Sequence, residues 1–293
     1  MLCRYLAGEQ DTLRQKLNVH GGLLFRGFGI DSVDVMSRAV RAFGGLPYKY
    51  EGGNSPRKHL ASEVYTSTDY PASETISLHH EMSYQPSWPA TLFFHCILPA
   101  RTGGQTTLAS TLDVSSAMPE EITAAFRRKR LNYIRTFHPK AAFGKTWQAT
   151  YLSDDRDEVE ALIARQGASC RWGEDGSLRV SAVCDAFVTD PRSQRELWFN
   201  QAEQWHPSAL HPEIRAMFER SYGVGRLAHH CEHADGDPID EDMLASIRQV
   251  LHDNSLLFDW ERGDFLIVDN LLMMHGRQPF AGPRQTGVFL SAV

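Results

Sequence analysis

Three residues that lie far apart in the sequence, His79, Glu81 and His275, form a candidate ligand set for a metal ion. If the segment LHHEMSY begins as a strand, alternation of side chains sends His79 and Glu81 to one face and His80 to the other. Two imidazoles and one carboxylate leave several coordination positions of an ion open, which suits a non-haem Fe(II) that must also bind O2. The three residues are therefore a candidate site for redox-active iron, with roles as surface or core-capping residues as the alternative.

The elements that must position these residues are expected to be mainly strands. Short apolar runs separated by Pro and Gly extend from Thr75 to Leu108, and their pattern is typical of strands. Further strands are predicted at 23–30, 260–270 and 286–293, with a hairpin around Asp175-Gly176. Helices are predicted from apolar spacing and end signals at 31–45, with Asp31 as N-cap, and at 119–130, 155–167, 211–223 and 240–254. Strands towards both ends with helices inserted between them suit one β-sandwich with helical insertions over residues 1–293, and the pattern of elements alone predicts an α+β class.

Composition excludes several classes of protein. The chain has 293 residues, of which 42% are hydrophobic, and this is enough for a large core. No apolar run approaches the roughly 18 residues of a membrane span, and the first residues lack a signal-peptide pattern. A net charge of -6 argues against a broad nucleic-acid surface, and the basic run at 127–130 is expected on a solvated helix face. Five cysteines without C-x-x-C spacing predict reduced thiols in a cytoplasmic protein.

Several longer segments carry a resemblance to one family. They are GGLLFRGFGI, GGNSPR, VYTSTDYPASETISLHHEMSY, WPATLFFHCILPARTGGQTTLAS, LWFNQ, WERGDFLIVDN and HGRQPFAGPR, in that order. On these segments the chain resembles the taurine dioxygenase superfamily of Fe(II)/2-oxoglutarate-dependent oxygenases. It is most similar to the syringomycin-biosynthesis-like and clavaminate-synthase-like branch, whose members carry H-x-E in place of H-x-D. The resemblance implies a double-stranded β-helix, or jelly roll, of about eight strands with helical insertions.

The resemblance also implies a chemistry. His79, Glu81 and His275 would hold Fe(II) and carry catalysis, with 2-oxoglutarate and O2 as co-substrates. Oxidative decarboxylation of 2-oxoglutarate to succinate and CO2 would drive the oxidation of an unactivated C–H bond. Hydroxylation is the default outcome, and desaturation and cyclisation stay open. Related halogenases lack the carboxylate, so Glu81 argues against halogenation.

The expected substrate is a small amino-acid-like molecule of specialised metabolism, either free or tethered to a carrier protein. No nucleic-acid or membrane partner is expected, and the sequence does not predict an oligomeric state.

Binding of 2-oxoglutarate needs a cation for its distal carboxylate, and the bidentate fork of arginine suits this role. The resemblance assigns the role to Arg284, with Arg277 as the alternative, and gives the hydroxyl of Thr106 a supporting contact. Relatives commonly carry two adjacent arginines here, often with the second as the binder, whereas this chain has Gln285 at the second position. This departure leaves open a metal-dependent jelly-roll enzyme that does not use 2-oxoglutarate. A non-catalytic small-molecule-binding protein on the same fold is the other alternative.

Other polar residues have more ordinary interpretations. The cluster at 229–233 (HHCEH) lacks the separated ligand pairs of structural zinc sites, and the resemblance predicts a loop there. His95 lies in an apolar strand and is expected to be a hydrogen-bonded core residue. Asp269 and Asn270 are expected to support the site rather than bind metal, and 198–201 matches a segment near the mouth of the family's active site.

Overall fold

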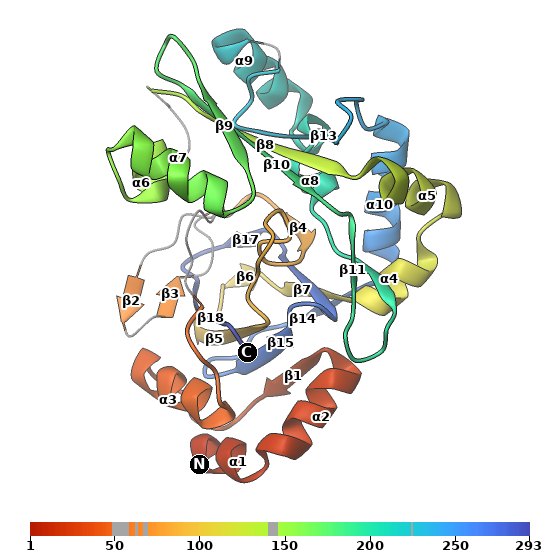
Figure 1. The fold of residues 1–293 in the computed structure, drawn as a ribbon. Coiled ribbons are helices and arrows are strands. Elements are labelled where there is room, and N and C mark those ends of the chain that lie inside the picture. Colours follow the sequence, from red (N-terminus) through yellow and green to blue (C-terminus); the bar gives the residue numbers. More distant parts are fainter. Residues whose placement is uncertain (49–58, 62–63, 67–69, 140–145, 224) are drawn as a thin grey trace.

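Two antiparallel sheets face each other and form a jelly roll (Figure 1). The computed structural model describes residues 1–48, 59–61, 64–66, 70–139, 146–223 and 225–293, so the motif GGNSPR lies outside the described residues. The larger sheet has the order β1 (Gly22–Phe25), β15 (Phe265–Asp269), β5 (Thr91–Leu98), β18 (Gln285–Ser291), β3 (Val64–Thr66) and β2 (His59–Ala61). The smaller sheet has the order β14 (Ser255–Phe258), β7 (Thr106–Ser110), β16 (Met273–Arg277) and β4 (Ile76–His79). The predicted jelly-roll class is therefore confirmed. The prediction of strands at both ends is correct near the C-terminus, whereas residues 2–20 form two helices that were not predicted and the strand predicted at 23–30 ends at Phe25.

The larger sheet is buried on both faces, which explains its nearly continuous apolar strands. Along β5, Leu92 and Cys96 point into the core between the sheets, whereas Phe93 points to the helices on the other side. The inner core also takes Leu108 from β7 and Met273 from β16, so side chains of both sheets meet there. His95 faces outward, and its Nδ1–H donates a hydrogen bond to the carbonyl of Asp264, 3.1 Å away, as expected for a hydrogen-bonded core residue.

Helices near the N-terminus cover the outer face of the larger sheet. They are α1 (Leu2–Gly8), α2 (Gln10–His20) and α3 (Val33–Phe43). The predicted helix at 31–45 is confirmed, but the prediction of Asp31 as its N-cap is wrong. Ser32 has the extended backbone of a cap, and its hydroxyl accepts the backbone N–H of Val35 at 3.4 Å. A side chain one residue earlier does not occupy the position from which it could accept this bond.

A long insertion between β7 and β14 builds a second layer over the smaller sheet. Its four-stranded sheet has the order β13 (His229–His233), β8 (Leu131–Phe137), β10 (Leu178–Cys184) and β9 (Ser169–Trp172). The hairpin predicted at Asp175-Gly176 joins β9 to β10 and is confirmed. The loop expected at 229–233 is wrong: these residues pair with β8 as an edge strand. Two short pairs complete the strands, β11 (Phe187–Thr189) with β12 (Glu196–Trp198) and β6 (Thr102–Gly103) with β17 (Phe280–Ala281).

The insertion also contributes helices, and these include the other four that the sequence predicts. They are α4 (Thr111–Ala117), α5 (Glu120–Lys129), α6 (Trp147–Tyr151), α7 (Arg156–Arg165), α8 (Ala202–Trp205), the 3-10 turn η1 (Pro207–Ala209), α9 (Pro212–Tyr222) and α10 (Glu241–Asp253). Leu78, Ala109 and Met274 on the outer face of the smaller sheet pack in one cluster with residues of α5, α8 and α10. The smaller sheet is therefore held from behind while its inner face points to the jelly-roll interior.

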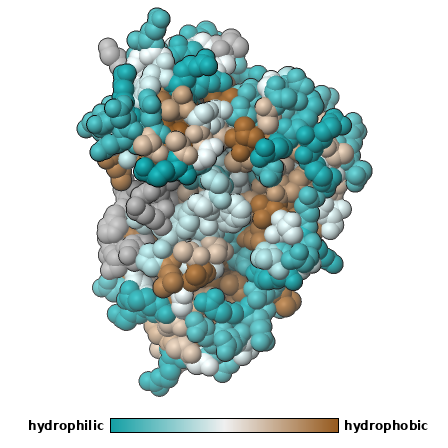
Figure 2. Space-filling view, in the orientation of Figure 1, coloured by the Kyte–Doolittle hydropathy of each residue, from teal (hydrophilic) through white to brown (hydrophobic). Residues whose placement is uncertain are grey.

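The surface agrees with the expectations from composition. On the face in Figure 2, hydrophilic residues cover most of the surface and hydrophobic residues appear only in separate small patches. The predicted solvated face of α5 is present: Arg127 pairs with Glu196, and the Lys129 amine pairs with Asp237. Within the described residues, every helix is too short or too polar to cross a bilayer.

Candidate metal centre and active site

The structure brings His79, Glu81 and His275 together on the inner side of the smaller sheet. One ligand atom from each residue lies within 4.8 Å of the ligand atoms of the other two. The Nε2 atom of His275 is 3.9 Å from a carboxylate oxygen of Glu81, and the two imidazole ring centres are 4.3 Å apart. Among the described residues, no other group of three His, Cys, Asp or Glu side chains has metal-binding geometry. Two nitrogen donors and one oxygen donor fit an Fe(II) site with open positions.

Strand pairing sets the distance between the two histidines. His79 ends β4 and is the direct partner of His275 on β16, so their side chains project from the same face. Gly276 follows His275 where the register of this pair shifts. A Cβ on Gly276 would approach the Ile76 carbonyl oxygen to 2.5 Å, so glycine permits the two strands to approach this closely.

Glu81 reaches the site from a turn and not from a strand. β4 ends at His79, and 81–84 form a turn in which Met82 has a positive φ of 61°. In the sequence analysis, strand alternation explains why the side chains of His79 and Glu81 point to the same site. This explanation is wrong, because Glu81 lies outside the strand. The side chain of Asn270 fixes the turn, because its oxygen accepts the Glu81 backbone N–H at 2.8 Å and its amide donates to the Glu81 carbonyl at 3.0 Å.

The two adjacent histidines have opposite surroundings. The Nδ1 atom of His79 lies 2.8 Å from the Ser77 carbonyl, so Nδ1–H donates there and Nε2 keeps a lone pair for a metal. His80 is fully buried on the other side and shares a hydrogen bond of 2.9 Å with the Thr111 hydroxyl. Burial, assisted by the neighbouring charge of His79, lowers the pKa of His80 to about 3. His80 is thus a neutral core residue that supports the turn.

A network behind the ligands holds the segment after β15. One Asp269 carboxylate oxygen accepts the N–H groups of Leu271 and Leu272, each at 2.9 Å, and the other accepts from Arg192 at 2.6 Å. Arg192 lies in the loop between β11 and β12, and no sequence spacing pointed to it. Asp269 and Asn270 therefore support the site without being ligands, as expected.

Arg284 lies in an unusual environment at the start of β18. Its guanidinium is half-buried, and burial lowers its pKa to about 10, with a further contribution from the positive charge of Arg277. Within the part of the chain that the structure describes, Arg284 has no hydrogen bond or ion pair; it lies over the Phe280 ring, 5.5 Å from its centre. Such a cation is suited to receive an anion.

The other candidate residues for binding 2-oxoglutarate differ in their exposure and in the hydrogen bonds they already make. Arg277 donates to the backbone carbonyls of Tyr70, Pro71 and Glu74, so its guanidinium is engaged in holding that loop. Gln285 is exposed. Thr106 is buried opposite Arg277 in the sheet, and its hydroxyl accepts the indole N–H of Trp260 at 2.8 Å. The hydroxyl hydrogen of Thr106 remains able to donate to a carboxylate.

The HHCEH cluster does not converge on one point. His229 contacts the Trp205 ring, whereas His230 lies near His206 and Glu232. Strand alternation along β13 sends neighbouring side chains to opposite faces.

Comparison with known proteins decides the family. The model of the taurine catabolism dioxygenase TauD, TfdA family matches residues 3–289. The chain belongs to this family. It is 35% identical over 274 residues to the dapdiamide synthesis protein DdaC of Enterobacter agglomerans, covering 94% of this chain and 83% of the relative. It is 28% identical over 289 residues to a clavaminate synthase-like protein of Arabidopsis thaliana, again with 94% and 83% coverage.

The fold is shared with solved oxygenases. A structure of asparagine oxygenase superposes with a TM-score of 0.57 at 14% identity, covering 99% of this chain and 79% of that one. Family membership and the His79, Glu81 and His275 geometry agree. The TauD-family chain is an Fe(II)/2-oxoglutarate-dependent dioxygenase that uses Fe(II), 2-oxoglutarate and O2.

Proposed function

We propose that this dioxygenase oxidises an unactivated C–H bond of a small amino-acid-like substrate in specialised metabolism, with hydroxylation as the default outcome. The observation that carries the proposal is the convergence of His79, Glu81 and His275, with ligand atoms within 4.8 Å of one another. Two relatives support the substrate class: DdaC belongs to dapdiamide synthesis, and asparagine oxygenase was solved with Fe(II), 3-hydroxyasparagine and succinate.

In this proposal each residue has a defined task. His79, Glu81 and His275 hold the iron, and the bound iron with 2-oxoglutarate and O2 supplies the oxidising power. Arg284 binds the distal carboxylate of 2-oxoglutarate, and the Thr106 hydroxyl adds a hydrogen bond. The half-buried, unengaged guanidinium of Arg284 supports this role better than Arg277, which already binds three carbonyls.

We also propose that residues 1–293 act as one domain, since β1 and β18 from its two ends lie in the same sheet. A cytoplasmic location is supported by five free thiols, two of them buried. The substrate is either free or tethered to a carrier protein. The two forms differ in charge, because tethering converts a carboxylate into a neutral thioester.

The test is anaerobic addition of Fe(II) and then 2-oxoglutarate to the purified protein. A weak visible charge-transfer band, absent in His275→Ala and retained in the exposed-histidine control His252→Ala, is expected. Metal binding without the band would favour a metal-dependent enzyme that does not use 2-oxoglutarate. No metal binding would favour a non-catalytic binding protein.

A further inference from the structure

Trp260 lies in the connection between β14 and β15 and donates a hydrogen bond to a residue of the proposed co-substrate site. It is 8% exposed and packs in the core between the two sheets of the jelly roll. Its indole nitrogen lies 2.8 Å from the Thr106 hydroxyl oxygen, and the bond is buried. An indole N–H can donate but cannot accept, so the Thr106 oxygen is the acceptor. Chemistry therefore fixes the direction of this hydrogen bond.

The direction of the bond decides what the Thr106 hydroxyl can do. A hydroxyl group has one hydrogen and two lone pairs, and it normally rotates to suit its partners. Because Trp260 occupies a lone pair, the hydrogen of Thr106 must point elsewhere. Within the residues that the structure describes, this hydroxyl makes no further hydrogen bond. An ionised carboxylate can only accept, so Trp260 holds the hydroxyl in the orientation that a carboxylate requires.

Thr106 lies between the iron ligands and Arg284. His275 pairs with Leu108 of β7, and Thr106 points to the same face two residues away, about 7 Å along the strand. Arg284 lies beyond Thr106 in the same direction, because a Cβ added at Gly104 would be 3.2 Å from its Cδ atom. A molecule that binds iron with one end and Arg284 with the other therefore passes the Thr106 hydroxyl.

The connection that carries Trp260 is held firmly on the sheet. Beside the Trp260 bond, the Gln105 amide donates to the Asp259 carboxylate at 3.0 Å, so two consecutive residues of each segment are joined. Arg26 donates to the Asp259 carbonyl at 2.7 Å and to the Asp264 carboxylate at 2.8 and 3.0 Å. The indole is thus positioned before any co-substrate binds.

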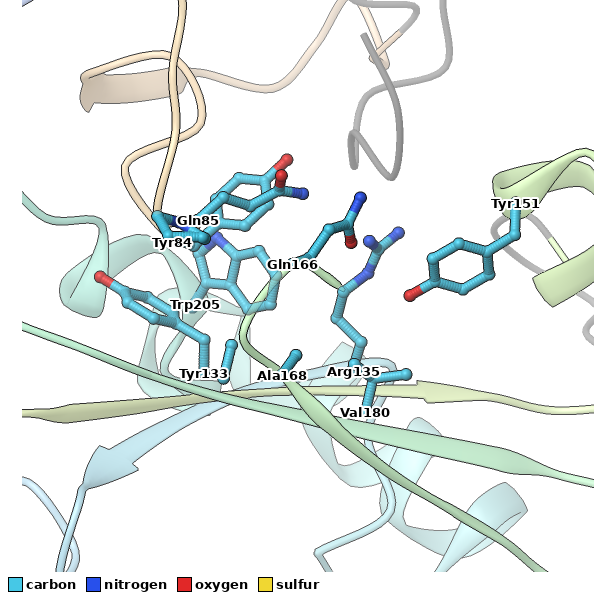
Figure 3. A pocket seen from close by; sticks show the side chains of 11 residues that line it. Tyr84, Gln85, Tyr133, Arg135, Tyr151, Gln166, Ala168, Val180 and Trp205 are labelled. Carbon is cyan, nitrogen blue, oxygen red and sulfur yellow. The ribbon is translucent and has the colours of Figure 1, made fainter. Parts of the chain in front are cut away.

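A pocket in the insertion does not offer a competing site for the co-substrate. Figure 3 shows this pocket, with Arg135 among the aromatic side chains of Tyr84 and Trp205. Its volume is about 30 Å³, which is room for about one water molecule. A five-carbon diacid does not fit there, so Thr106 and Arg284 remain the relevant residues.

We propose that Trp260 is a positioning residue for co-substrate binding: its N–H holds the Thr106 hydroxyl as a donor to the distal carboxylate of 2-oxoglutarate. This inference rests on the proposed function and adds to it a residue that acts through Thr106. Arg284 supplies the charge that attracts the carboxylate, and the pair of Trp260 and Thr106 supplies a donor of fixed direction.

Anaerobic titration of the Fe(II)-loaded enzyme with 2-oxoglutarate, followed by the visible charge-transfer band, is the test. The dissociation constant is measured for wild type, Trp260→Phe, Thr106→Val and the double variant. We expect each single variant to raise the constant about three- to tenfold, since each loses one oriented hydrogen bond. The double variant should bind no more weakly than Thr106→Val alone, because Trp260 acts only through the Thr106 hydroxyl.

Controls separate positioning from core packing. Trp147→Phe makes the same change at another tryptophan that is 8% exposed, in the core of the insertion, and should leave the dissociation constant unchanged. In air, Trp260→Phe should raise the Michaelis constant for 2-oxoglutarate and leave kcat at saturating 2-oxoglutarate near that of wild type. Site-specific replacement of Trp260 by benzothienylalanine keeps the shape of the ring and removes only the N–H. It should reproduce the loss of affinity, and it remains decisive if Trp260→Phe fails to fold.

Three results would overturn the inference. They are normal affinity for 2-oxoglutarate in Trp260→Phe, normal affinity in the benzothienylalanine protein, and a double variant in which the two losses multiply in full. The last result would make Trp260 a packing residue independent of Thr106. Absence of the charge-transfer band in wild type would overturn the proposed function and this inference with it.

Discussion

The side chain of Asn270 binds the backbone of Glu81 on both sides, through the Glu81 N–H at 2.8 Å and the Glu81 carbonyl at 3.0 Å. It also donates to the Pro89 carbonyl at 2.8 Å. The carboxylate ligand stands in a turn, where no sheet hydrogen bonds hold it. Asn270 therefore replaces the sheet as the element that fixes its position.

We predict that Asn270→Ala weakens Fe(II) binding roughly 10- to 100-fold, the usual effect of removing a group that orients a metal ligand. Anaerobic Fe(II) titration measures the affinity. Asn254→Ala, at the end of α10, serves as the matched control and should bind iron as wild type does. Unchanged affinity in Asn270→Ala would show that the turn holds Glu81 without it.

Substitution of each ligand should separate metal binding from folding. His79→Ala, Glu81→Ala and His275→Ala should each abolish turnover and iron binding. His80→Ala should keep the iron but lose stability, on the order of 1–3 kcal/mol, because it leaves the Thr111 hydroxyl without its buried partner. Iron content and urea unfolding are the measurements, and loss of iron in His80→Ala with retention in His79→Ala would reverse the assignment.

For the co-substrate, Arg284→Gln should raise the apparent Michaelis constant for 2-oxoglutarate by at least about tenfold, equivalent to roughly 1.4 kcal/mol. Arg277→Gln should mainly lower thermal stability, since Arg277 holds the Tyr70, Pro71 and Glu74 carbonyls. Gln285→Ala, at an exposed position, should change neither the Michaelis constant for 2-oxoglutarate nor the thermal stability. If Arg277→Gln strongly raises the Michaelis constant for 2-oxoglutarate and Arg284→Gln leaves it unchanged, Arg277 and not Arg284 binds the distal carboxylate.

The contact between β16 and β4 should tolerate no added methyl group. In Gly276→Ala the new Cβ would meet the Ile76 carbonyl oxygen at 2.5 Å, so the strands must separate and His79 must move relative to His275. We expect iron affinity to fall at least about tenfold, because ligand geometry governs affinity. Gly8→Ala, where nothing lies within 4 Å, is the control and should leave iron binding intact. Normal affinity in Gly276→Ala would mean that the strand pair adapts.

Acid should destabilise the fold through His206. Burial, with the His230 charge as the second cause, lowers the pKa of His206 from 6.5 to about 4. The unfolded chain therefore binds more protons than the folded chain across this interval, and the contribution of His206 to stability is lost as pH falls from 6.5 towards 4.

Replacement of His206 by Asn keeps an acceptor for the Ser208 N–H and removes the titration. The difference in unfolding free energy between pH 7 and pH 5 should shrink by on the order of 1–2 kcal/mol, measured by urea unfolding. An unchanged difference would exclude His206 as a contributor.

The metal ligands could be predicted from the sequence because chemistry restricts which residues bind iron, and His79, Glu81 and His275 stand in recognisable local segments. How the fold positions these ligands could not be predicted from the sequence. The strand ends at His79, and Glu81 is held by the side chain of Asn270, which is far away in the sequence. Arg192 was missed for a related reason: it acts through Asp269, which lies 77 residues away, and short spacing carries no signal of such a contact. The edge strand β13 was mistaken for a loop because its polar sequence, HHCEH, lacks an apolar face.

The position of β18 in the larger sheet has a consequence for the order of events in the cell. β18 lies between β5 and β3, and β16, which carries His275, precedes it by only a few residues. The smaller sheet can therefore close once the chain has been made through Arg277, whereas the larger sheet needs the chain through at least Ser291. The non-local pairing that results is slow to form, and the half-made chain exposes unpaired strand edges. We therefore expect the iron site to become enclosed only after β16 and β18 have both been synthesised.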